Sequence, residues 1–262
     1  MERDIIAKRI ARLNLYCDIF AQNVLDDKAT VEYLLRNILG TDDLFVDNTE
    51  VQHRLASVEN HSAVLDVWAH DSSGTYYDIE IQQSSDGAIP ERARYYSSLI
   101  DSTLLDKGES YDMLPETYVI FFAREDVLVG DKQIYHIERV VKETQEPFND
   151  REHIIYINGA SRDISNELGR IIHDFRCADV RDFLTQPLKQ RVAYYKEPDE
   201  GGYEKMSDIM DQFRAEDARN TALKLAISFG FSAAQIAEVV SFDEETVAQW
   251  LAEAAENEDT KK

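Results

Sequence analysis

The sequence predicts an α/β fold in the first part of the chain and an all-helical second part. Apolar and polar residues alternate over 75–82, which is typical of a half-buried strand. A short, almost wholly apolar run, TYVIFFA, occupies 117–123 and is typical of a central strand covered on both faces. After Gly159 the apolar residues follow helical spacing instead. We therefore predict an α/β core over 1–160 and a helical C-terminal region over 161–262.

The first predicted elements are a helix and two strands. Apolar residues recur at helical spacing over 28–39, and Gly40 follows as a stop signal. Two strands are predicted over 63–70 and 75–82, with a short turn between them. The other predicted elements follow in chain order: a helix over 89–108, strands over 117–123, 133–141 and 153–158, and helices over 165–177, 179–195, 203–230, 232–240 and 244–255.

The last two predicted helices, over 231–255, have the spacing of a helix-turn-helix. Ser232 with Gln235 and Ser241 with Glu244 form two successive capping-box patterns. The second helix begins with acidic residues and contains no Lys or Arg, although a recognition helix normally presents positive charge to phosphates. Contact with DNA and a packing or partner-binding role both stay open for this pair.

The strands at 63–70 and 75–82 carry opposed acidic residues. If Ser72, Ser73 and Gly74 form a three-residue loop with Gly74 in the left-handed conformation, Asp66 lies opposite Glu80. The Cβ atoms of directly opposed residues are ~5 Å apart. Two carboxylates held that close either share a proton or bind a divalent cation. A two-residue loop that offsets the acids, and a solvated hairpin with an acidic outer face, are the alternatives.

The composition is that of a globular protein with a strong negative charge. Hydrophobic residues make up 44% of the 262 residues, and 51 acidic against 28 basic residues give a net charge of −23. Such a charge repels polyanions at long range and argues against a passive nucleic-acid coat. A local site in which a cation bridges acids and phosphate is compatible with it.

Several other kinds of site are not predicted. Cys17 and Cys177 lie far apart, and neither belongs to a CxxC motif or a Cys/His cluster, which is typical of a reduced intracellular protein. The six histidines show neither HxxxH nor HxH spacing, so no zinc site is expected. The sequence contains no glycine-rich phosphate loop, so no nucleotide cofactor is expected. The charged N-terminus and the lack of a ~20-residue apolar run predict no signal peptide or membrane span, so the cytoplasm is the expected location.

The motifs around the acidic strands resemble a known nuclease family. The stretch VLDVWAHDSSGTYYDIEIQ resembles the core of the PD-(D/E)xK nucleases, where a metal-binding Asp on one strand precedes a (D/E)-x-K signature on the next. A helix with an R-x-x-Y-Y-type motif and a Y-x-x-L-P motif before an apolar strand follow. With glutamine in place of lysine, this order is similar to the PD-(D/E)xK family of transposases, also called the Rpn family of recombination-promoting nucleases. The resemblance covers 55–125 strongly and 15–55 loosely, and implies a restriction-endonuclease-like central mixed sheet flanked by helices.

The resemblance also implies roles for single residues. Asp66 and Glu80 match the metal ligands and would bind Mg²⁺ or another divalent cation such as Mn²⁺ or Ca²⁺. Gln82 stands at the lysine position, where it can hydrogen-bond the attacking water but cannot supply positive charge. Glu32, on the first helix, matches an acidic position that can add a ligand or orient metal-bound water. Arg92 is either a phosphate contact, since guanidinium groups suit phosphate oxygens, or a structural partner of the acids.

The implied function is metal-dependent endonucleolytic cleavage of DNA by phosphodiester hydrolysis. The cation would polarise the scissile phosphate and lower the pKa of a bound water. The alternative is a catalytically weakened or inactive nuclease scaffold that acts as a protein-interaction module, because Gln82 lacks the charge of lysine. Given the net charge of −23, the expected DNA binding is weak and transient. A homodimer is an expectation from the class.

Overall fold

The computed structural model describes residues 2–55 and 63–259, which form two compact units. The larger unit runs from Ala11 to Glu197, and the smaller one combines Met1–Ile10 with Pro198–Lys262. The boundary expected at residue 160 falls inside the larger unit, because the two helices that follow it pack against the helices on the sheet. His61 lies outside the described residues.

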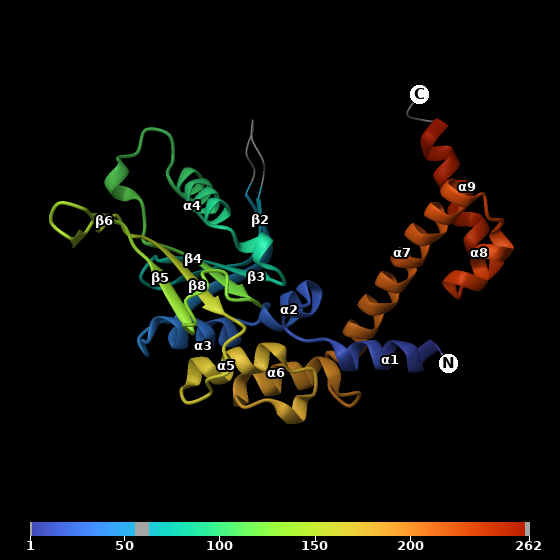
Figure 1. Ribbon diagram of the computed structural model, residues 1–262, viewed down its shortest axis with the longest axis horizontal. Coiled ribbons are helices and arrows are strands. Elements are labelled where there is room, and N and C mark those ends of the chain that lie inside the picture. Colours follow the sequence, from blue (N-terminus) through green and yellow to red (C-terminus); the bar gives the residue numbers. More distant parts are fainter. Residues whose placement is uncertain (1, 56–62, 260–262) are drawn as a thin grey trace. The chain divides into compact units, whose positions relative to one another are not determined.

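A mixed six-stranded sheet forms the centre of the larger unit (Figure 1). Its strands, in spatial order, are β1 (Val46–Leu55), β2 (Ala63–Asp71), β3 (Tyr76–Gln82), β4 (Thr117–Ala123), β8 (Glu152–Asn158) and β5 (Ile134–Ile137). β1, β2 and β3 are antiparallel, β3, β4 and β8 are parallel, and β5 returns antiparallel at the edge. This is the restriction-endonuclease-like mixed sheet that the sequence predicted.

Helices cover both faces of the sheet (Figure 1). One face carries α4 (Pro90–Leu104), whose buried side chains join the apolar core over β2 and β4. The other face carries α2 (Asp18–Leu25), α3 (Lys28–Leu39), α5 (Glu167–Arg176) and α6 (Gln186–Lys196). Short 3-10 turns, η1 (Ser85–Ala88), η2 (Tyr111–Met113) and η3 (Val180–Asp182), connect these elements.

Local signals explain most of these boundaries. The side chain of Asp27 caps α3 by accepting from Thr30 N–H, and Gly40 ends the helix in the left-handed conformation with φ +66°. All but one residue of β4 are buried, as expected for a central strand. The strand predicted over 133–141 is divided into β5 and β6 (Val140–Val141), which pairs with β7 (Glu146–Pro147) in a separate ribbon.

The smaller unit contains most of α1 (Glu2–Arg12) and three helices, α7 (Tyr203–Phe229), α8 (Ala233–Val240) and α9 (Glu244–Asp259). Ala222, Ile236 and Val247 form the buried centre of the last three. Among the described residues, no helix combines the length and apolar character that a membrane span requires.

One of the two capping boxes predicted at this end of the chain is confirmed. The side chains and backbones of Ser232 and Gln235 bond reciprocally at the start of α8. The prediction for Ser241 is wrong, because Ser241 ends α8 in the left-handed conformation with φ +58°. Asp243 caps α9 in its place by accepting from the backbone and hydroxyl of Thr246.

Candidate functional site

The loop between β2 and β3 sets the register of the two strands. Gly74 takes a left-handed conformation with φ +83°, and Asp71 N–H donates to Thr75 O at 3.0 Å. The buried carboxylate of Asp71 accepts from the backbone N–H groups of Ser73 and Thr75 and from the hydroxyls of Ser73 and Tyr77. Burial alone would raise the pKa of Asp71, but these hydrogen bonds together lower it. The predicted three-residue loop is therefore confirmed.

This register places Asp66 opposite Glu80. The outermost pair of the β2–β3 ladder is Val67 with Ile79, so the next step brings the two acids together. Asp66 N–H donates to Glu80 Oε1 at 3.0 Å, and Ile81 N–H donates to Asp66 Oδ2 at 2.9 Å. Each carboxylate thus holds the backbone of the other strand, and the alternative two-residue loop is excluded.

The acidic face of β3 is buried, not solvated. Asp78 and Glu80 are both fully inaccessible, so the alternative of an exposed acidic ribbon is wrong. Among the described residues, no hydrogen-bond partner reaches either carboxylate oxygen of Asp78. The sequence reasoning gave Asp78 no role, although its position two residues before Glu80 places both on the same face.

Arg92 reaches the acids from α4. Its Nη2 lies 3.1 Å from Glu80 Oε2 and 2.8 Å from the hydroxyl of Tyr96, and its guanidinium stacks over the Tyr96 ring. The amide of Gln82 donates to the same Oε2 of Glu80 at 3.2 Å. About a third of the Arg92 side chain is exposed, with 34% accessible, whereas Arg94 on the same helix is exposed. Of the two hypotheses for Arg92, a phosphate contact or a structural partner of the acids, the observed ion pair with Glu80 is the second.

One guanidinium does not balance three neighbouring acids. Burial, followed by the charge of Asp66, raises the pKa of Glu80, although Arg92 opposes the shift. Burial and then the charges of Glu80 and Asp66 raise the pKa of Asp78 well above its ordinary value. Burial likewise raises the pKa of Asp66. The cluster therefore favours an additional positive charge, whether protons or a cation.

The oxygen atoms of the cluster fit a hard divalent cation, which prefers carboxylate ligands. Both oxygens of Asp78 are free of hydrogen bonds from the described residues, and Asp66 Oδ1 has only a long 3.5 Å contact with Gln52 Nε2. Gln52 lies on β1, between the residues that pair with Val67 and Leu65 of β2. Its backbone is left-handed, with φ +55°, inside the strand. Such backbone strain in a residue other than glycine is concentrated at functional sites.

Glu32 does not join this cluster. Its carboxylate accepts from Val46 N–H at 3.0 Å and pairs with Arg36 at 2.9 Å. Val46 is paired with Asp71, five residues beyond Asp66 along β2 and thus ~17 Å from it at ~3.3 Å per residue. Glu32 therefore fastens the start of β1 to α3.

A different acid is close to Asp66 from the helical side. Asp18, the first residue of α2, lies near enough for its charge to add to the burial that raises the pKa of Asp66. Asp18 is exposed, so solvent reaches this side of the cluster. The helical pattern of the sequence gave no signal for Asp18, because its position depends on how α2 packs on the sheet.

Comparison with known proteins gives one match. A family model described as PD-(D/E)XK nuclease family transposase matches residues 19–162, which include β2, β3 and α4. No curated protein and no solved structure matches the chain.

Proposed function

The chain belongs to the PD-(D/E)XK nuclease family of transposases, and from this premise we propose that it is a metal-dependent DNA endonuclease with Asp66 and Glu80 as metal ligands. The observation that carries the proposal is the reciprocal hydrogen bonding at the end of the β2–β3 ladder. The buried carboxylate of Glu80 and the half-buried carboxylate of Asp66 each accept from the backbone of the other strand. Asp78 supplies a third buried acid whose oxygens lack hydrogen-bond partners in the described part of the chain.

The residues of the cluster fit a hard divalent cation such as Mg²⁺, because all of the candidate ligand atoms are carboxylate oxygens. When bound, such an ion would polarise the scissile phosphate and lower the pKa of the attacking water. The oxygen donors would also accept Mn²⁺ or Ca²⁺. No nucleotide cofactor is part of the proposal.

The protein's own residues hold the site in shape. The backbone N–H of Asp66 donates to Glu80 Oε1, and the backbone N–H of Ile81 donates to Asp66 Oδ2. Gln82 donates its amide to Glu80 Oε2, which leaves its carbonyl oxygen as a potential acceptor for a water proton. Arg92, with a third of its side chain exposed, neutralises part of the buried charge and offers a guanidinium to an incoming phosphate.

The proposed substrate is DNA, bound weakly and transiently. The net charge of −23 opposes association at long range, and screening over ~8 Å at physiological salt limits that repulsion. A homodimer that joins two DNA-binding grooves, and a location in the cytoplasm, stay predictions from the sequence.

Nicking of supercoiled plasmid by the purified full chain tests the proposal. Cleavage is expected with Mg²⁺ and not with EDTA, and Asp66→Asn or Glu80→Gln is expected to lower the rate by ~100-fold or more, the effect of losing several kcal/mol of charge stabilisation. Glu32→Gln is the matched control, because Glu32 lies outside the cluster, and it is expected to retain cleavage. Equal cleavage by wild type and Asp66→Asn would remove the proposed site.

The inactive scaffold is the second candidate, and two contacts favour it. Gln82 brings no positive charge to the site, and Arg92 pairs with Glu80, one of the two proposed metal ligands. This candidate predicts no metal-dependent turnover in the plasmid assay. Cleavage by wild type that depends on Asp66 would exclude it.

A further inference from the structure

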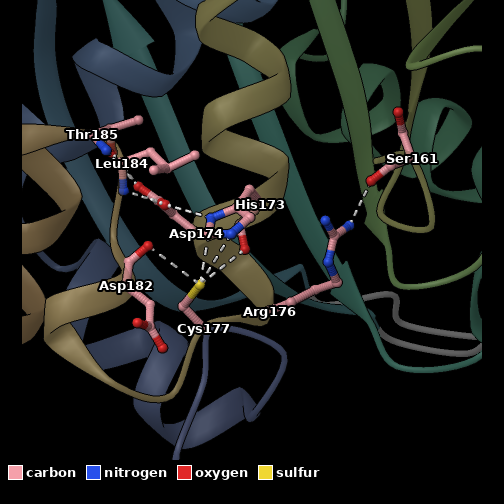
Figure 2. A network of polar contacts seen from close by, with 8 residues as sticks. All are labelled: Ser161, His173, Asp174, Arg176, Cys177, Asp182, Leu184 and Thr185. Atoms are coloured by element: carbon pink, nitrogen blue, oxygen red, sulfur yellow. Dashed lines mark hydrogen bonds and ion pairs between the residues drawn. The ribbon is translucent and has the colours of Figure 1, made fainter. Parts of the chain in front are cut away.

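A second group of metal-ligating side chains lies at the C-terminal end of α5, on a different element from the acidic strands. His173, Asp174 and Cys177 each offer one ligand atom, and these atoms all lie within 4.8 Å of one another. Figure 2 shows the three side chains converging, with Cys177 just past the last turn of the helix. Sequence spacing predicted no zinc site and no Cys/His cluster. The His-x-x-x-Cys spacing, which places both residues on one helical face, was the missed signal.

The separations between the donor atoms match those of a tetrahedral zinc site. Cys177 Sγ lies 3.4 Å from His173 Nδ1, and the same nitrogen lies 3.1 Å from Asp174 Oδ1. Metal–ligand bonds of ~2.3 Å to sulfur and ~2.0–2.1 Å to nitrogen and oxygen, at tetrahedral angles, separate S from N by about 3.5 Å and N from O by about 3.4 Å. The third separation, between the thiol and the carboxylate, is within 4.8 Å.

Asp174 is held in a fixed orientation. It is fully buried, and its two oxygens accept from the backbone N–H groups of Leu184 and Thr185 and from the Thr185 hydroxyl (Figure 2). Oδ1, the oxygen nearest His173, takes one of these donors and keeps a lone pair for a cation.

The surroundings of Cys177 are predominantly acidic. Burial raises the pKa of the thiol to about 11, and the charges of Asp174, Asp182 and Asp179 add to the shift. A protonated thiol of this kind is a poor nucleophile, which argues against a catalytic cysteine. Arg176 points away from the cluster and donates to the carbonyl of Ser161 at 2.8 Å, as Figure 2 shows.

Lys196, whose charge reaches Cys177, is turned toward backbone carbonyls. Its ammonium donates to the carbonyl oxygens of Leu13 and Ala178. The charges of three carboxylates therefore act on Cys177, and the charge of Arg176 opposes them. About a third of the His173 side chain is exposed, so water can reach an open coordination position.

We propose that His173, Asp174 and Cys177 bind Zn²⁺, with water in the fourth position. A sulfur, a nitrogen and an oxygen donor suit this borderline-soft ion better than Mg²⁺, which prefers oxygen alone. Binding releases the thiol proton to solvent and leaves the thiolate on the metal. The ion would join three side chains at the end of α5, of which Asp174 also bonds the segment that leads into α6. The site is separate from the acidic cluster on β3.

Cobalt(II) titration of the metal-free full-length protein tests this site, because thiolate ligation gives a near-ultraviolet charge-transfer band. Wild type is expected to show the band, which saturates when the thiolate site is filled, and Zn²⁺ is expected to abolish it by displacement. Cys177→Ser is expected to lose the band. Cys17→Ser is the matched control and is expected to retain it, since these are the two cysteines of the chain.

Two further variants keep the result interpretable. His173→Gln leaves the thiol in place and is expected to weaken Co²⁺ binding by ~10-fold or more, as loss of a ligand does. Glu80→Gln is expected to leave the band unchanged, which separates this site from the proposed nuclease site. Absence of the band in wild type, its persistence in Cys177→Ser, or its loss in Cys17→Ser would overturn the proposal.

Discussion

The amide of Gln82 occupies the space that a side chain at Gly87 would need. A Cβ atom at Gly87 would lie 2.0 Å from Gln82 Oε1 and 3.0 Å from its Cδ. Gly87 belongs to the short turn η1, which follows β3 directly. The turn therefore holds Gln82 where its Nε2 reaches Glu80 Oε2 at 3.2 Å.

Gly87→Ala is expected to lower the proposed cleavage to the level of Gln82→Ala. The added methyl displaces the flexible amide and breaks its bond to Glu80, and misplacement by about 1 Å costs up to ~100-fold in rate. The free energy of unfolding is expected to change by about 1 kcal/mol at most, the low end for overpacking, because only a side-chain end has to move. Plasmid nicking and urea unfolding measure the two effects.

The double variant provides the control. Without the amide at position 82, the methyl at position 87 has nothing to displace, so Gly87→Ala is expected to add no further loss to Gln82→Ala. Additive losses in the double variant would show that Gly87 acts by another route.

Arg92→Gln is expected to lower the free energy of unfolding in EDTA by about 2 kcal/mol. Removing one partner of a fully buried ion pair costs ~3–5 kcal/mol, and the exposure of Arg92 reduces this figure. Because the three acids then lack their cation, Mg²⁺ is expected to restore more stability to the variant than to wild type. Urea unfolding with and without Mg²⁺ measures this.

Arg94→Gln is the matched control for Arg92→Gln. Arg94 lies on the surface of the same helix, so its removal is expected to change the free energy of unfolding by less than ~0.5 kcal/mol. A similar loss in both variants would contradict the role assigned to Arg92.

Two buried aspartates of the same pair of strands are expected to respond oppositely to Asn. Asp71→Asn is expected to cost about 2 kcal/mol, because an amide NH₂ replaces an oxygen that accepts hydrogen bonds. Asp78→Asn is expected to raise stability in EDTA by about 1 kcal/mol, because it removes a buried ionisable group that has no hydrogen-bond partner in the described residues. Thermal unfolding of both variants measures the contrast. A large destabilisation by Asp78→Asn would show that its carboxylate is satisfied in solution.

Local patterns predicted the acidic strands well, because the relevant forces act over a few residues. Alternation placed Asp66 and Glu80 on strands, and Gly74 fixed the loop length that opposes them. The strand β1 was not predicted, since its residues are mostly half-exposed at the edge of the sheet and show no clear apolar alternation. The sequence therefore predicted the register between β2 and β3, but it did not predict that β1 pairs with the other edge of β2.

The sequence did not predict the roles of residues whose contacts depend on packing between distant segments. Glu32 lies on a helix that the sequence predicts, but its hydrogen bond from Val46 N–H depends on how α3 packs against β1. Asp18 and Asp66 are 48 positions apart in the sequence, and only the placement of α2 brings their charges together. Cys177 and His173 are near neighbours, but the buried Asp174 between them is oriented by Thr185, the residue that precedes α6.

Lys196 is expected to make stability rise between about pH 8 and pH 10.5. Burial lowers the pKa of Lys196 to about 8 in the folded protein, against 10.5 in the unfolded chain, although Asp179 opposes the shift. Within this window the unfolded chain binds more protons than the folded protein, so the free energy of unfolding increases with pH. Below about pH 8 both states are protonated and the slope vanishes. The gain across the window is expected to be about 1–2 kcal/mol, reduced from the full linkage value because Lys196 is partly exposed.

Comparison with Lys196→Met isolates this contribution, because the methionine does not titrate while other alkaline groups remain in both proteins. Urea unfolding at pH 7.5 and pH 10 should show stability rising more with pH in wild type than in the variant. If both proteins change equally between the two pH values, the ammonium of Lys196 keeps its ordinary pKa, and its contacts with the carbonyls of Leu13 and Ala178 fully compensate its burial.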